Sequence, residues 1–180
     1  TILETAGVGI FGMNREGRTT FCNPSAAAMV GYSAEEQVGK FQHDLIHHSH
    51  PNGSKYDLDD CPIHNTFKNG ASYRISEDVF WKKNGSSFPV EYISSPVFDG
   101  QKVVGAVVTF KDISLQIHLA EEKDILLEDL QRINTELKGF AHIVSHDLKE
   151  PLRGISYNSK WLLEDFGEKL GAEGAKLIDL

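Results

Sequence analysis

Hydrophobic residues follow two different patterns along this chain, and the change falls near residue 114. Before it, short apolar runs alternate with turn sequences such as those at 14–17 and 82–85. This pattern is typical of β-strands joined by tight turns. From Leu115 onward, apolar residues recur every three or four positions, which is the period of a helix. We therefore expect a strand-rich domain over 1–114, followed by a long helix.

The first region favours an α+β fold. Strand-like runs cover residues 8–13, 19–22, 72–81, 87–97 and 102–111. Between the second and third runs, the pattern predicts three helices, over 24–30, from 33, and over 58–68. Asn23 is a plausible N-cap, residues 33–36 form a capping box and Gly70 is suited to a helix end. The predicted order is β-β-α-α-α-β-β-β, with about five antiparallel strands.

The second region carries a heptad pattern. One series of apolar residues recurs at positions 119, 126, 133 and 140, and a second at 130, 137 and 144. This spacing predicts a signalling coiled coil over 115–138 and a parallel homodimer. Past Val144 the apolar residues step by four, just where Pro151 is expected to loosen or bend the helix. We expect the helix to reach about Asp165, with a turn at Gly167 and Gly171 and a second helix over 172–180.

Composition and charge exclude several functions. The net charge of −8 argues against a nucleic-acid surface, which needs clustered Lys and Arg. No apolar run approaches the ~20 residues that span a bilayer, so no membrane segment is expected. Cys22 and Cys61 are two cysteines without a framework spacing, which favours a reducing, cytoplasmic location. Because the chain begins without Met and stops within an amphipathic run, we expect a piece of a longer protein.

His146 is the first candidate for chemistry. Val144 and Leu148 lie on the predicted apolar seam, so a residue two positions from each should face solvent. An exposed neutral imidazole is a competent nucleophile near pH 7, and the adjacent Asp147 could orient it. The alternative is an incidental His–Asp pair on a solvated helix face, and spacing alone favours that alternative.

A nine-residue motif instead favours a chemical role for His146. Residues 145–153, Ser-His-Asp-Leu-Lys-Glu-Pro-Leu-Arg, closely resemble the H-box of sensor histidine kinases, in the subgroup written S-H-D-L-x-E-P-L-R. The resemblance implies that His146 is the phosphoacceptor, Asp147 its acid/base partner and Pro151 the helix-bending residue. It also places Lys149 and Arg153 near the phosphate or a protein partner.

The kinase resemblance carries further expectations. The family places this motif in the first helix of a dimerising hairpin, so 139–180 would be the dimerisation and phosphoacceptor region, truncated in its second helix. ATP and Mg²⁺ would belong to the full-length parent, and a response-regulator receiver domain would accept the phosphoryl group. The N-box, the glycine-rich ATP lid and a G-x-x-x-x-G-K loop are absent from this sequence. No cofactor is therefore expected in this fragment, and the ATP-binding domain is missing from it. Many such kinases have Asn or Thr where this chain has Glu150, which implies a weak phosphatase.

The first 114 residues resemble a PAS domain, a sensor module whose sheet is covered by helices on one face. Separated motifs at 9–11, 21–26, 31–36, 39–40, 83–86 and 110–114 carry this resemblance. The last is similar to the D-I-T element that connects the sheet to an output helix. Asp112 or Ser114 is expected to cap that helix. The resemblance implies signal sensing, but the PAS ligand stays unknown.

A histidine-rich insert provides a weaker metal signal. His47-x-x-His50, followed by Cys61-x-x-His64, resembles a zinc-ligand spacing. His64 is also the nearest candidate for an axial haem ligand. However, residues 51–54 read as a turn and Cys61 is suited to packing under a helix, so we expect no metal. Aromatic residues on the strands are likewise read as core and not as a ligand pocket.

A rival function remains open at this point. A PAS domain with a dimerising coiled coil could work as a non-enzymatic module that binds a ligand or metal, with His146 incidental. The extended H-box favours the kinase fragment, because a simple coiled coil does not need it.

Overall fold

The computed structural model describes residues 7–178 and divides the chain into two units, one ending at Ala120 and the other beginning at Glu121. The first unit holds the sheet and the second consists of helix. Within the described residues, no helix is both long enough and apolar enough to cross a membrane.

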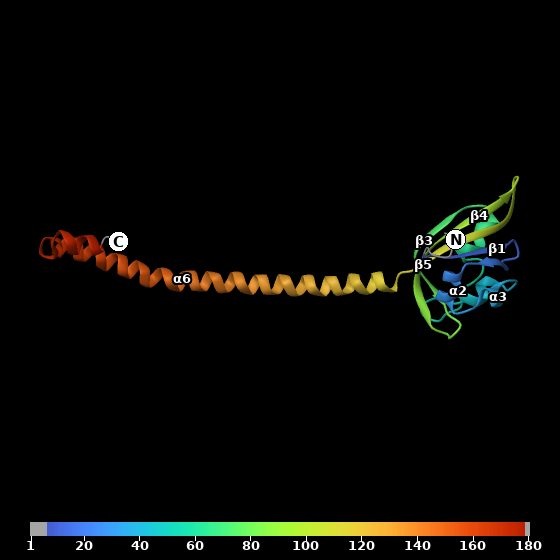
Figure 1. Ribbon diagram of the computed structural model, residues 1–180, viewed down its shortest axis with the longest axis horizontal. Helices are drawn as coiled ribbons and strands as arrows, with labels where there is room; N and C mark the ends of the chain where they lie inside the picture. The colour runs from blue at the N-terminus through green and yellow to red at the C-terminus, as the bar shows by residue number, and fades with distance from the viewer. Residues whose placement is uncertain (1–6, 179–180) are drawn as a thin grey trace. The chain divides into compact units, whose positions relative to one another are not determined.

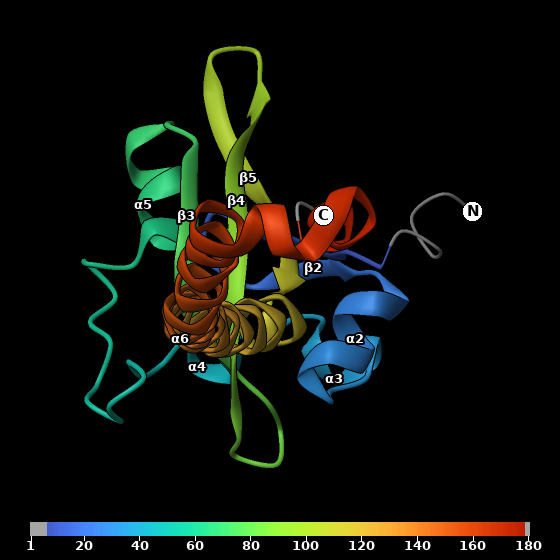
Figure 2. The same cartoon turned by 90° about the vertical axis from the view of Figure 1, so that its left-hand side faces the viewer.

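The first unit is built on one antiparallel sheet in the order β2-β1-β5-β4-β3 (Figures 1 and 2). Its register places Phe11 opposite Val108 and Tyr92 opposite Phe110. The strands are β1 (Gly9–Asn14), β2 (Thr19–Cys22), β3 (Tyr73–Trp81), β4 (Ser87–Asp99) and β5 (Lys102–Asp112). The predicted five antiparallel strands are confirmed, and the fold is α+β.

Four helices lie between β2 and β3: α2 (Pro24–Val30), α3 (Ala34–Gln37), α4 (Gln42–Ile46) and α5 (Pro62–Asn69). Asn23 caps α2 by accepting the Ala26 N–H, and Ser33 forms the predicted capping box with Glu36. Helix α5 begins four residues later than the predicted start at residue 58. Pro62 occupies its first turn, where the N–H that proline lacks would have no partner within the helix.

The short helix α4 was not predicted. It has five residues, and Phe41 at its N-cap gives no side-chain cap. A segment this short leaves no periodic pattern to detect. Tertiary packing stabilises it, because Gln42 and Ile46 are buried.

The core lies on one face of the sheet. Along β4, the alternate residues Phe88, Val90, Tyr92 and Ser94 are buried, as the period of a strand requires. The helices cover this face: Thr66 of α5 donates a hydrogen bond from Oγ1 to Ser94 Oγ at 2.7 Å. Large aromatic side chains fill the space between sheet and helices, in agreement with the expectation that the strand aromatics are mainly core.

Helix α6 (Ser114–Ile178) begins directly after β5. The Asp112 carboxylate accepts hydrogen bonds from Ser114 N–H at 2.9 Å and Ser114 Oγ–H at 2.6 Å. In addition, Ile113 N–H donates to the Pro89 carbonyl at 3.1 Å. Of the two predicted capping residues, Asp112 is therefore the one that accepts the helix's first free donors, and it links the sheet's last strand to the helix.

Helix α6 continues past its predicted end near Asp165, and of the two glycines predicted to form the turn, Gly171 is the one that breaks it. The helix passes through Pro151, Asp165 and Gly167, and its backbone leaves helical angles at Gly171, with φ 69° and ψ 169°. Only glycine adopts these angles without strain. Gly167 has φ below zero and is tolerated within the helix at a modest cost in stability. The predicted second helix therefore starts after Gly171, and residues 179–180 lie outside the described part.

Candidate functional site

His146 lies on the exposed surface of α6. Its side chain is 70% exposed, and its Nδ1 stands 3.3 Å from Asp147 Oδ1. When the Nδ1–H donates to this carboxylate, the lone pair is left on Nε2, the ring atom that can attack an electrophile. The neighbouring seam residues Val144 and Leu148 are exposed as well, so exposure alone does not set His146 apart. His142, one turn earlier, is also exposed.

The other H-box residues extend the same row along the helix. Lys149 and Glu150 follow His146 by three and four residues, and Arg153 follows it by seven, so all three lie on its side of α6. All three are exposed. The row thus places two cations and one carboxylate within two turns of the imidazole.

Apolar side chains are exposed along the predicted coiled-coil seam. The exposed fractions of Leu119, Leu126, Leu130, Ile133 and Leu137 range from 53% to 62%. A contiguous apolar stripe of this length is not stable against water. Such a stripe is typical of a helix face that packs against another apolar surface.

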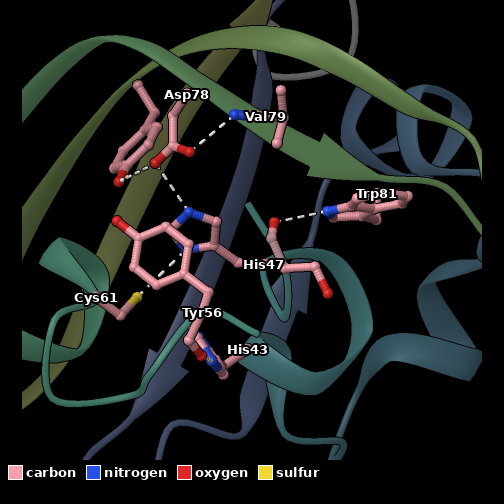
Figure 3. A network of polar contacts seen from close by, with 9 residues as sticks. His43, His47, Tyr56, Cys61, Asp78, Val79 and Trp81 are labelled. Carbon is pink, nitrogen blue, oxygen red and sulfur yellow. Dashed lines mark hydrogen bonds and ion pairs between the residues drawn. The ribbon is translucent and has the colours of Figure 1, made fainter. Parts of the chain in front are cut away.

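A second cluster lies inside the sheet domain, where α4 ends against β3 and β4 (Figure 3). His47 is 1% exposed, and its Nε2–H donates to Asp78 Oδ2 at 2.9 Å. Asp78 also accepts the Val79 N–H at 2.8 Å and the Tyr92 hydroxyl at 3.2 Å. Four groups, from the end of α4, from β3 and from β4, therefore meet in one network of hydrogen bonds.

Cys61 completes the cluster from the other side of His47. It precedes α5, is 2% exposed, and its Sγ lies 3.2 Å from His47 Nδ1. Burial favours the neutral thiol, but the rings of His43 and His47 beside the sulfur outweigh it and lower the pKa of Cys61 to about 6. Burial also opposes charge on His47, yet its bonds to Asp78 and Cys61 raise the pKa of His47 to about 9. Both pKa shifts go in the direction that favours a proton on His47 and a thiolate on Cys61.

The structure brings together only part of the predicted histidine and cysteine set. His47 and Cys61 are neighbours, whereas the His50 ring stacks on Tyr56 with centroids 4.1 Å apart. His64 lines an adjoining cavity, and its Nδ1 is buried without a hydrogen-bond partner. The third member of the cluster is His43, whose ligand atom lies within 4.8 Å of those of His47 and Cys61.

Sequence reasoning missed His43 and Asp78. His43 precedes His47 by four residues, so a helix assigned to this segment would have placed both rings on one side. Asp78 stands 31 residues from His47, and no local pattern joins them.

This chain resembles known proteins in both sequence and structure. The family model described as PAS fold matches residues 1–113, which is well over half of the chain. This chain belongs to the PAS family. Its PAS domain is therefore a sensory module.

Two curated relatives are histidine kinase or phytochrome proteins. Signal transduction histidine-protein kinase AtoS of Escherichia coli is 23% identical over 155 residues, covering 86% of this chain and 23% of AtoS. Cyanobacterial phytochrome B of Nostoc sp. is 49% identical over 69 residues, covering 38% of this chain and 9% of the phytochrome. This PAS chain thus spans less than a quarter of the length of either relative.

Solved structures confirm the fold. The PAS domain of a Colwellia psychrerythraea protein superposes with a TM-score of 0.52 at 19% identity, covering 63% of this chain and 92% of that domain. An RNA-binding Light-Oxygen-Voltage receptor gives a TM-score of 0.53 at 20% identity, covering 74% of this chain and 36% of the receptor. At these identities the likeness concerns architecture alone.

Proposed function

We propose that this chain is the sensing and phosphoacceptor part of a two-component histidine kinase, phosphorylated on His146. The observation that carries the proposal is the exposed imidazole of His146, with Nδ1 facing Asp147, on a helix that starts at the last PAS strand. A signal that alters the PAS domain would reach the helix through the Asp112–Ser114 contact.

The chemistry requires little from this chain. His146 Nε2 attacks the γ-phosphorus of ATP, so that a P–N bond forms while the bond from phosphorus to the ADP oxygen breaks. Asp147 holds the Nδ1 proton and stabilises the positive charge that develops on the ring. An aspartate of a response-regulator receiver domain then attacks the phosphorus, which breaks the P–N bond. ATP and Mg²⁺ would be bound by the kinase's ATP-binding domain.

The match with AtoS supports an assignment that includes the helix. Because the PAS family model ends at residue 113, an alignment of 155 residues must continue into α6. The similarity of this chain to AtoS therefore extends beyond the PAS domain. The exposed apolar seam supports a parallel homodimer, in which two copies of α6 bury their leucines against each other.

The test compares two histidines on the same helix. The purified chain is incubated with labelled ATP and a separate histidine-kinase ATP-binding domain, and acid-labile, base-stable label is measured. We expect His146→Gln to remove the label and His142→Gln to keep it, since His142 is exposed one turn away. Label that persists in His146→Gln, or is lost in His142→Gln, would reject this assignment.

The exposed seam favours one alternative, a non-enzymatic module in which the PAS domain controls dimerisation and His146 is incidental. It predicts that no label appears on wild type with any ATP-binding domain, while a change in the PAS domain alters the dimer's dissociation constant. The phosphorylation assay and sedimentation together separate the two functions.

A further inference from the structure

We propose that the PAS domain binds one soft transition-metal ion, zinc or copper, between His43, His47 and Cys61. The three ligand atoms lie within 4.8 Å of one another, inside the domain and close to the sheet's buried face (Figure 3). Neither His146 nor any other residue of helix α6 contributes a ligand, so this inference is independent of the proposed function.

The backbone arranges these ligands for a single ion. His43 is the second residue of α4 and His47 is its C-cap, one turn later, so their rings project from the same side. Cys61 approaches from the start of α5, and its Sγ is already 3.2 Å from His47 Nδ1. Tetrahedral zinc, with bonds of about 2.0–2.3 Å, sets its ligand atoms roughly 3.3–3.7 Å apart. The observed cluster needs only small side-chain adjustments to reach that spacing.

Both imidazoles are held in the tautomer that a metal requires. The His43 Nε2–H donates to the Tyr56 carbonyl at 3.0 Å, and the His47 Nε2–H donates to the Asp78 carboxylate at 2.9 Å. Metal-bound histidines in proteins donate their second ring N–H to such a carbonyl or carboxylate. These bonds direct Nδ1 of each ring toward the sulfur side of the cluster.

One ring nitrogen of the cluster is among the buried polar atoms that have no hydrogen bond in the described residues. His43 Nδ1 is buried and has no hydrogen bond within the described residues. A buried, unpaired acceptor is unfavourable, and native structures rarely keep one without a reason. A metal ion bonded to Nδ1 supplies that reason.

The sulfur is suited to the same role. Metals bind cysteine as the thiolate, and Cys61 Sγ is buried with His47 Nδ1 3.2 Å away. An entering cation replaces the proton shared between His47 and Cys61, which is released to solvent. Thiolate with imidazole selects zinc or copper over magnesium and calcium, which prefer oxygen ligands.

A fourth position adjoins the cluster. A cavity of about 20 Å³, enough for roughly one water molecule, borders His43, His47 and Cys61. Met13 and His64 also line it, and His64 Nδ1 is buried without a hydrogen bond in the described part of the chain. The ion would thus have three protein ligands and one position open to water, to His64 or to the Met13 thioether.

The experiment uses Co²⁺ as a spectroscopic probe of the zinc site. Protein freed of metal by chelator is titrated with Co²⁺ and then Zn²⁺, and a parallel arm uses Cu⁺ under anaerobic, reducing conditions. We expect a thiolate-to-cobalt charge-transfer band that saturates at one equivalent and is removed by Zn²⁺. Stoichiometric Cu⁺ binding that requires Cys61, without Zn²⁺ binding, would equally support the site and identify copper as its metal.

Matched variants decide whether the predicted ligands bind the ion. Cys61→Ser should abolish the band, whereas Cys22→Ser should keep it. His43→Gln, which still offers an N–H to the Tyr56 carbonyl, should weaken Co²⁺ binding at least about tenfold. His50→Gln and His146→Gln should bind as wild type does. Near-UV circular dichroism confirms that each variant is folded, and His43→Gln remains informative if Cys61→Ser is not.

Three results would overturn the proposal. They are the absence of stoichiometric binding of either metal, a cobalt band that survives Cys61→Ser, and an unchanged cobalt affinity in folded His43→Gln.

Discussion

Two histidine–carboxylate pairs in this chain occupy opposite environments. His47 and Asp78 are 1% and 9% exposed and meet at 2.9 Å, with the remaining carboxylate bonds supplied by Val79 and Tyr92. His146 and Asp147 are 70% and 71% exposed and meet at 3.3 Å. The first pair comes from separate elements of a packed domain, and the second from adjacent positions on one helix.

The difference shows how burial divides structural from chemical roles. A buried charge must keep its partner, because losing it leaves an uncompensated charge away from water. An exposed pair contributes about 0–1 kcal/mol to stability, since water replaces either partner. The exposed imidazole is therefore free to react with a large substrate, whereas the buried one can accept only a proton or a small ion.

We expect the largest effect from substitutions in the apolar stripe of α6, which a second copy of the chain is proposed to bury. Leu130→Asp with Leu137→Asp removes four leucines from a homodimer, and burial of each is worth about 1.5–3 kcal/mol. Sedimentation equilibrium should therefore show monomers. The exposed pair Glu128→Asp with Glu136→Asp is the control and should stay dimeric. A dimer that survives the leucine substitutions would mean that the PAS domain holds the two copies together.

The two carboxylates should differ strongly in their effect on stability. In metal-free protein, Asp78→Ala should lower the free energy of unfolding by about 3–5 kcal/mol, because it leaves His47 and Tyr92 without their acceptor. Asp147→Ala should change it by less than about 0.5 kcal/mol. Urea denaturation followed by circular dichroism measures both. Equal losses of unfolding free energy in the two variants would contradict the different roles assigned to the two pairs.

Two helix caps extend the comparison on a smaller scale. Asn23 is 1% exposed, and its side chain joins Ile10, Ala26 and Val8 by three hydrogen bonds, so Asn23→Ala should cost about 2 kcal/mol or more. Ser33 caps the four-residue helix α3 at an exposed position, and Ser33→Ala should cost about 0.5–1 kcal/mol. Thermal denaturation gives both values. A larger loss from Ser33→Ala would contradict the ranking by burial.

The smallest effect concerns Glu150, one turn after His146. Its carboxylate would stand near the regulator's phosphoaspartate, and repulsion of roughly 1 kcal/mol would disfavour hydrolysis there. In the full-length parent, Glu150→Asn or Glu150→Thr should speed regulator dephosphorylation several-fold, with kinase activity as the control. Brisk dephosphorylation by wild type that both substitutions slow would make Glu150 a working phosphatase residue.

Local signals predicted much of the fold. The Asn23 cap, the capping box at Ser33 and the stop at Gly70 all involve residues within one or two turns of each other, so the sequence shows them directly. The positions of the five strands along the chain and the long helix follow from periodicity. Two errors remained: α4 is too short to leave a pattern, and of the two glycines predicted to form the turn, Gly167 stays helical while Gly171 breaks the helix.

The same division applies to the two sites. By itself, the sequence determined the exposed candidate, because His146, its carboxylate and the row to Arg153 lie within eight consecutive residues of one helix. Only the tertiary structure decided the buried cluster. His43, Cys61 and Asp78 come from a short helix, a loop and a strand, and their meeting depends on how α4 and α5 pack against the sheet. Helical spacing is local, whereas packing between distant segments depends on the whole core.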